Sequence, residues 1–121
     1  MKKTVLIGAT TNPTRYAYLA GNRLTEHGHD LVPIGIRKGM LADKEILDLR
    51  LLPKVENVDT VTLYIGPKNL LEWEEYVLSL HPKRIIFNPG TENYSFRKKV
   101  ENQGIEALEA CTLVMLSAGT Y

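Results

Sequence analysis

The segment from Gly8 to Pro13 contains the residue types in this sequence that best suit the binding of an anion. It follows an apolar run that ends at Ile7 and leads into a helical pattern that begins at Arg15. Glycine lets a ligand approach the backbone closely, and the free amides and dipole of a helix N-terminus favour an anion. Arg15 adds a bidentate cationic donor. We therefore assign a candidate phosphate-binding loop to Gly8, Ala9, Thr10, Thr11, Asn12, Pro13 and Arg15.

This loop lacks the second and third glycines of the GxGxxG fingerprint of dinucleotide-binding domains. Pro13 fixes a backbone angle at a point where that fingerprint is flexible. The alternative interpretation is an ordinary strand-to-helix turn with threonine caps, and we expect Thr14 to cap the following helix. The loop by itself leaves both interpretations open.

A second basic feature, Arg37 and Lys38, follows the next apolar segment of the chain. In dinucleotide enzymes the second strand ends near an acidic residue that holds the ribose hydroxyls. No acid ends the strand here, which argues against NAD and favours a ligand with a phosphate at its ribose end. The alternative is a solvated basic turn.

The stretch of residues 86–93 (IFNPGTEN) again joins an apolar run to a helical pattern. Asn88 and Glu92 offer hydrogen bonds to a ligand, and Thr91 offers a cap for the helix. Structural capping and ligand binding are therefore both consistent with this loop.

Residues for catalysis or metal binding are not grouped in the sequence. His27, His29 and His81 fall in turns that enter strands, remote from the strand carboxyl ends where ligands bind. Cys111 is the one cysteine, and a buried inert thiol is its ordinary role. We therefore expect no metal site, no catalytic residues and a binding function rather than a reaction.

The elements that position these loops alternate between strand-like and helix-like patterns, which indicates an α/β domain with a mostly parallel sheet. The expected strands cover residues 4–7, 30–36, 58–65, 83–87 and 105–108. The expected helices cover residues 15–27, a segment that begins at Pro67, and residues 92–103. Residues 42–52 fit either a short helix or a short strand near Glu45 to Leu47, and the tail from Cys111 to Tyr121 is expected to dock as a helix or turn.

The composition is that of an ordinary globular domain, with 121 residues, 44% hydrophobic and 24% charged. A net charge of +1 does not favour nucleic acid or an anionic membrane as a partner. No apolar run reaches the length of a transmembrane helix, and the run after Lys3 is too short for a signal peptide. Because a single cysteine also suits a reducing compartment, we expect a cytoplasmic protein.

Over nearly its whole length the sequence resembles the small single-domain CoA-binding proteins related to the N-terminal domain of the succinyl-CoA synthetase α subunit. The stretches that carry the resemblance are GATTNPTRYAY, EHGHDLVPIGIRKG, LPKVENVDTVTLYI, RIIFNPGTEN and NQGIEALEAC. The opening loop keeps the family's glycine, small residue, hydroxyl residue, proline and arginine at Gly8, Ala9, Thr10, Pro13 and Arg15.

The resemblance implies one Rossmann-like domain over residues 1–121, with a doubly wound, mostly parallel five-stranded sheet in three α/β/α layers. It also implies that the opening loop binds the phosphates of CoA. The ligand loops depart from the family's pattern. Ile34-Gly35-Ile36 replaces the family's Val-Asn-Pro before the basic Arg37, and Phe87-Asn88-Pro89-Gly90 replaces a Trp-x-Gln-x-Gly segment. The catalytic histidine of the synthetase lies in another domain, so the resemblance implies binding and not ligation.

Three functions remain open at this point. The first is non-catalytic binding of CoA or an acyl-CoA, with the 3′-phosphate at Arg37 and Lys38 and the adenine near Tyr64 and Ile65. The second is a protein-interaction domain that has lost its nucleotide, and the third is an NAD(P)-binding protein. The apolar tail from Leu113 to Leu116 could also serve an interface between copies of the chain.

Overall fold

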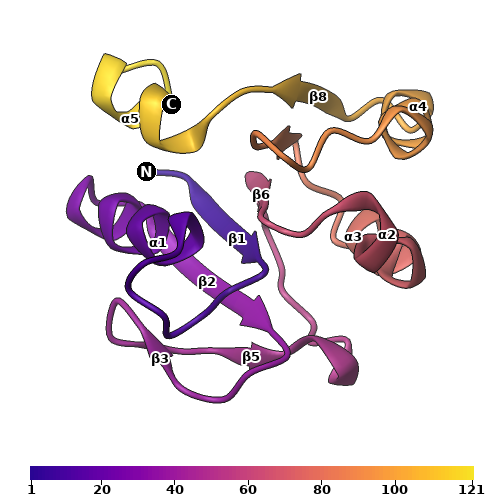
Figure 1. Cartoon of the computed structure of the whole chain (residues 1–121). Helices are drawn as coiled ribbons and strands as arrows, with labels where there is room; N and C mark the ends of the chain where they lie inside the picture. The colour runs from indigo at the N-terminus through magenta and orange to yellow at the C-terminus, as the bar shows by residue number, and fades with distance from the viewer.

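The computed structural model describes residues 1–121 and shows a parallel sheet between two layers of helices (Figure 1). The sheet has the order β5-β2-β1-β6-β7-β8, and every pairing in it is parallel. Its strands are β1 (Lys3–Ile7), β2 (Asp30–Gly35), β5 (Leu47–Asp48), β6 (Thr60–Leu63), β7 (Arg84–Phe87) and β8 (Glu106–Glu109). The helices are α1 (Tyr16–Glu26), α2 (Pro67–Leu70), α3 (Glu74–Ser79), α4 (Tyr94–Asn102) and α5 (Thr112–Ala118).

The α/β Rossmann-like fold is confirmed, with six strands in the sheet where five were expected. The additional strand, β5, lies in the ambiguous segment and is only two residues long. A small separate hairpin of β3 (Met40–Leu41) and β4 (Lys44–Glu45) precedes it. Segments this short bury too few alternating side chains to give a clear pattern in the sequence.

Side chains of β1 and β7 alternate between two apolar clusters, one on each face of the sheet. Leu6 and Ile86 pack with residues of α1 and α5, which cover one face (Figure 1). Val5 and Ile85 belong to the other cluster, which includes residues of α3 and α4. Burial on both faces explains why these strands appear as continuous apolar runs in the sequence.

The helix that Pro67 begins is interrupted. Pro67 stands at the first position of α2, as expected. A 3₁₀ turn, η2 (Leu71–Trp73), then separates α2 from α3. The buried face formed by Tyr76, Val77 and Leu80 still contributes to the core. None of the five helices combines the length and apolar character that a membrane crossing requires.

Two expected helix caps were wrong. The residue before α1 is Arg15 and no side chain caps this helix, because the Thr14 hydroxyl donates to the Asn12 carboxamide oxygen at 2.7 Å. The Thr91 hydroxyl donates to the Asn88 carbonyl at 2.8 Å, and Asn93 caps α4 by accepting from the amide of Phe96.

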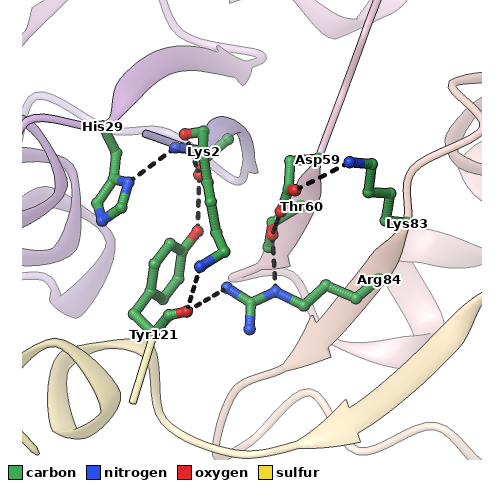
Figure 2. A network of polar contacts seen from close by, with 8 residues as sticks. Lys2, His29, Asp59, Thr60, Lys83, Arg84 and Tyr121 are labelled. Atoms are coloured by element: carbon green, nitrogen blue, oxygen red, sulfur yellow. Dashed lines mark hydrogen bonds and ion pairs between the residues drawn. The ribbon is translucent and has the colours of Figure 1, made fainter. Parts of the chain in front are cut away.

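The two ends of the chain meet at the amino ends of the strands, where Tyr121 lies against β1 and β7 (Figure 2). Lys2 Nζ and Arg84 Nη2 both donate to the carbonyl oxygen of Tyr121, at 2.8 and 3.2 Å. The Lys2 amide donates to His29 Nδ1 at 3.0 Å, and the His29 and Tyr121 rings lie 4.8 Å apart. The tail after Cys111 is therefore docked on the sheet, as expected.

We expect this junction to weaken in acid through His29. Burial, and then nearby positive charges that include Lys2, lower the pKa of His29 in the folded chain. The unfolded chain therefore takes up a proton first, and stability falls as the pH drops below about 6.5, the usual histidine value. His29→Asn, which keeps an acceptor but does not titrate there, should flatten this loss in thermal melts between pH 7.5 and 5.5. The exposed His81→Asn is the control, and equal flattening by both variants would contradict the assignment to His29.

Candidate functional site

The strand order reverses between β1 and β6, and a cleft opens there at the carboxyl ends of the strands. The chain runs from β1 to β2 on one side and returns to β6 on the other side of β1. Open α/β sheets bind ligands in the crevice at this point. The cleft here has a volume of about 1010 Å³, which reaches the upper end of the range of ligand sites. We call it the switch-point cleft.

Two glycines bring the backbone segments around the cleft close together. Gly8 has φ +101°, and a Cβ at this position would lie 2.6 Å from the carbonyl oxygen of Tyr64. A Cβ at Gly35 would lie 2.6 Å from the carbonyl oxygen of Ala9. The amides of Gly8 and Ala9 both donate to the Ile34 carbonyl, at 2.9 and 3.0 Å. The floor of the cleft is thus made of tightly packed backbone that a side chain would displace.

The loop from Thr10 to Arg15 is held by its own hydrogen bonds. The Asn12 amide donates to Thr10 Oγ1 at 3.1 Å, and Asn12 Oδ1 accepts from the Thr14 amide at 3.0 Å. At the start of α1, the amides of Tyr16 and Ala17 donate to no backbone or side-chain acceptor, and both residues line the cleft. The loop therefore presents an open helix N-terminus to the cleft, which is the arrangement that binds anions.

Three arginines from three separate segments line the cleft, namely Arg15, Arg37 and Arg50. Glu72 is the one acidic residue among the lining residues. Three cations against one carboxylate give the cleft a positive balance, although the whole chain carries a net charge of only +1. Such a local imbalance attracts anionic ligands.

Arg50 is fixed by Asp48, at the end of β5. Asp48 Oδ1 accepts from Arg50 Nε at 2.9 Å, and Asp48 Oδ2 accepts from Nη2 at 3.2 Å. The hydrogen bonds with the Arg50 side chain and amide lower the pKa of Asp48, so this carboxylate stays ionised. Nη2 also donates to the Ile36 carbonyl at 3.4 Å, which links Arg50 to the loop that carries Arg37.

The structure brings only part of the sequence-predicted set into the cleft. The predicted residues that line it are Gly8, Ala9, Thr10, Arg15, Arg37, Tyr64 and Ile65. The predicted residues that do not line it are Thr11, Asn12, Pro13, Lys38 and Asn88. Within the second group, Thr11 packs beside Gly39 and Asn12 holds the loop through its hydrogen bonds.

The apolar wall of the cleft differs from the expectation at Tyr64. The ring of Tyr64 packs with the cluster under α1 and α5, and its buried hydroxyl has no hydrogen-bond partner. Burial raises the pKa of Tyr64. Ile65 and Trp73 instead pack on the opposite cluster and line the cleft together. They form the apolar surface that is available to a planar ligand group.

Asn88 is a buried residue that stabilises the elements beneath the cleft through hydrogen bonds within the protein. Its side chain is 1% exposed, and Nδ2 donates to Thr62 Oγ1 at 2.7 Å and to the Leu63 carbonyl at 2.8 Å. Its Oδ1 accepts from the Thr112 amide at 2.9 Å. Because these bonds occupy the carboxamide within the protein, Asn88 holds β6, β7 and α5 together and its side chain does not reach the cleft.

Arg50 and Trp73 are the functional candidates that sequence reasoning missed. Arg50 lies in the segment whose structure was ambiguous, and only the pairing of Gly35 with Asp48 brings it to the carboxyl edge of the sheet. Trp73 has the helical spacing to Tyr76, Val77 and Leu80 that is typical of an amphipathic helix, so the sequence gives no sign of a ligand contact there. A basic residue three positions after a possible short strand was the available signal for Arg50.

A second hollow, of about 1430 Å³, lies at the opposite, amino ends of the strands. Lys3 and Lys83 line it together with Asp59 and Glu75. Charges of both signs line this hollow, whereas arginines outnumber the single carboxylate in the switch-point cleft. No three histidine, cysteine or acidic side chains gather closely enough anywhere in the chain to hold a metal ion.

Most apolar side chains of the C-terminal tail pack against the rest of the molecule. Leu116 is buried in the cluster under α1 and α5, and Leu113 and Met115 pack partly against that cluster. Val114 is the one residue of the tail's apolar segment that projects, with 62% exposure. A contact between copies through this tail would therefore involve mainly Val114.

Comparison with known proteins gives one family and several related structures. A family model described as "CoA binding domain" matches residues 2–117. The chain is similar to a crystal structure described as that of an uncharacterized protein, with 55% identity and a TM-score of 0.96 over 100% of this chain and 98% of the other. It is also similar to cell-free ID.343 from Thermus thermophilus, with 25% identity and a TM-score of 0.85 over 99% and 91% of the two chains.

A hypothetical protein from Pyrococcus horikoshii OT3 shares the fold, with 24% identity and a TM-score of 0.83 over 97% of this chain and 82% of the other. No curated protein matches the chain significantly.

Proposed function

This chain belongs to the CoA-binding domain family, and we propose on that basis that residues 1–121 form a single domain that binds CoA or an acyl-CoA in the switch-point cleft. The observation that carries the proposal is the coincidence of three features in one place. The cleft lies where the strand order reverses, the N-terminus of α1 opens into it without a cap, and three arginines line it. Each feature favours a ligand with several phosphates.

In this proposal the parts of the ligand match the parts of the cleft. The diphosphate takes the free amides of Tyr16 and Ala17 and the side chain of Arg15. The 3′-phosphate lies toward Arg37, with Lys38 outside the cleft adding to the local positive potential. The adenine takes the apolar surface of Ile65 and Trp73 in place of the Tyr64 ring, which packs against the cluster under α1 and α5.

The proposal is one of binding and not of catalysis. The titratable side chains that line the cleft are arginines, tyrosines and Glu72, with no histidine or cysteine among them. Nucleophilic or general acid–base chemistry uses a reactive group paired with a base or acid of suitable pKa. The lining offers groups that orient an anion and no such pair.

Calorimetric titration of CoA into the chain and into Arg15→Ala tests the proposal. We expect the wild-type chain to bind CoA. Because a hydrogen bond to a charged group contributes about 1.5–3 kcal/mol, Arg15→Ala should weaken binding roughly tenfold to a hundredfold. Arg23→Ala, in an exposed position near the far end of α1, is the matched control and should leave the affinity unchanged.

Absence of CoA binding at millimolar ligand would contradict the proposal and would favour a protein-interaction domain of the same fold. Equal losses in Arg15→Ala and Arg23→Ala would contradict the placement of the phosphates. Binding of NADP with no binding of CoA would instead favour the dinucleotide alternative.

A further inference from the structure

The Asp48–Arg50 pair lies at the edge of the switch-point cleft, near the carboxyl end of β2. In dinucleotide-binding enzymes, the acidic residue that binds the ribose lies at the corresponding place. Asp48 lies beside Gly35, the last residue of β2, in the parallel pairing of β2 with β5. It is thus the acidic residue nearest the carboxyl end of the second strand, the position from which a carboxylate binds a free ribose diol. In this chain, however, Arg50 and not Asp48 lines the cleft.

Both oxygens of the Asp48 carboxylate are occupied by Arg50. Oδ1 accepts from the Arg50 amide at 3.0 Å as well as from Nε, and Oδ2 accepts from Nη2. Oδ1 already accepts two hydrogen bonds, so a ribose diol that used both carboxylate oxygens would have to displace a bond of this bidentate pair. The pair therefore competes with a ribose diol for Asp48.

The same pair leaves part of the Arg50 guanidinium free. Nε and Nη2 bond to Asp48 and to the Ile36 carbonyl, whereas Nη1 makes no hydrogen bond within the protein. The side chain of Arg50 is 59% exposed, so this group is open to a ligand. Arg37 directly follows Ile36, and the Nη2 bond therefore ties the Arg37 loop to Arg50. The segments that carry Arg37 and Arg50 thus lie next to each other at the cleft.

We propose that the Asp48–Arg50 pair makes the cleft selective for a nucleotide with a phosphorylated ribose over one with a free ribose diol. Arg50 acts in two ways, by occupying Asp48 and by joining Arg37 in a receptor for a phosphomonoester. The inference rests on the proposed function, since it names the class of nucleotide for the same cleft. It assigns to Arg50 a role that the basic loop after β2 would otherwise fill alone.

The test compares the binding of CoA and dephospho-CoA, which differ only in the 3′-phosphate, to wild type and to Arg50→Gln. We expect Arg50→Gln to weaken CoA binding roughly tenfold or more, in line with the loss of a charged donor. Binding of dephospho-CoA should not weaken by more than about twofold, since this ligand lacks the group that Arg50 contacts. It should be equal or tighter, because its free ribose diol gains access to Asp48 once Arg50 is removed. Arg97→Gln is the control, because Arg97 also pairs with acidic residues but lies on α4, outside the cleft.

A purely structural role of Arg50 would weaken both ligands together, so the ratio of the two affinities is the decisive readout. Arg50→Lys provides a second variant that keeps the charge and lacks the fork that holds both Asp48 oxygens. We expect Arg50→Lys to lower the ratio of CoA affinity to dephospho-CoA affinity at least about threefold.

The outcomes separate the inference from the proposed function. A wild-type chain that binds CoA and dephospho-CoA equally would overturn the inference and leave the proposed function standing. The inference would also be overturned if neither Arg50 variant changed the ratio of CoA affinity to dephospho-CoA affinity. An equal change of this ratio in Arg97→Gln would overturn it as well. A wild-type chain that binds neither ligand would overturn both.

Discussion

Replacement of Gly8 by alanine is expected to destabilise the chain by about 3 kcal/mol, because a left-handed backbone and a steric clash add at one position. Gly8 has φ +101°, where any side chain is strained, and the new Cβ would lie 2.6 Å from the Tyr64 carbonyl oxygen. That oxygen belongs to the backbone just after β6 and cannot rotate away. For a domain of this size we expect the melting temperature to fall by about 10 °C.

The control for Gly8→Ala is Gly104→Ala. Gly104 also has a positive φ, of +75°, but a Cβ there would meet no atom within 4 Å. It should therefore carry only the backbone cost, about 1 kcal/mol. Urea unfolding of both variants gives the two free energies of unfolding, and their difference isolates the clash. If Gly8→Ala costs no more than Gly104→Ala, the close approach of β1 and β6 at the cleft is not a constraint on this position.

The fold was predictable because its signals are local and repeated. β1 and β7 are buried on both faces, so each contains an unbroken apolar run, Val5 to Ile7 and Ile85 to Phe87. In β6 the apolar Val61 and Leu63 alternate with buried threonines. Glycines such as Gly28 mark helix ends through a positive φ that other residues avoid. The alternation of these patterns leads to a parallel sheet, and the position of the cleft then follows from the loops at the strand carboxyl ends.

The details of the site were less predictable because they depend on which polar groups meet in space. Thr14 and Thr91 are good cap residues by type, yet other partners take their hydroxyls. Tyr64 follows a strand that ends at the cleft, but the direction of its ring is decided by packing under α1 and α5. Arg50 reaches the cleft only through a two-residue strand that pairs at the edge of the sheet.

Replacement of Asn88 by alanine distinguishes a structural role of this side chain from a ligand-binding role. Of the substitutions of polar residues considered, we expect it to lower the free energy of unfolding the most. The change leaves the Thr112 amide and the Leu63 carbonyl without their Asn88 partner in the interior. Each buried polar group without a partner costs about 1–3 kcal/mol, so we expect a total loss of about 3–4 kcal/mol. Urea unfolding measures this loss, with the exposed Asn102→Ala on α4 as a control expected to change stability little.

The same variant should bind CoA with nearly wild-type affinity under conditions where it remains folded. Asn88 contacts no part of the switch-point cleft with its side chain, and it acts on the cleft only by holding the turn that carries Pro89 and Gly90. A ligand contact would give the opposite result, with a large loss of affinity and an unchanged free energy of unfolding. Because the two roles predict opposite pairs of measurements, unfolding and titration of this one variant decide whether the altered loop after β7 supports the site or forms part of it.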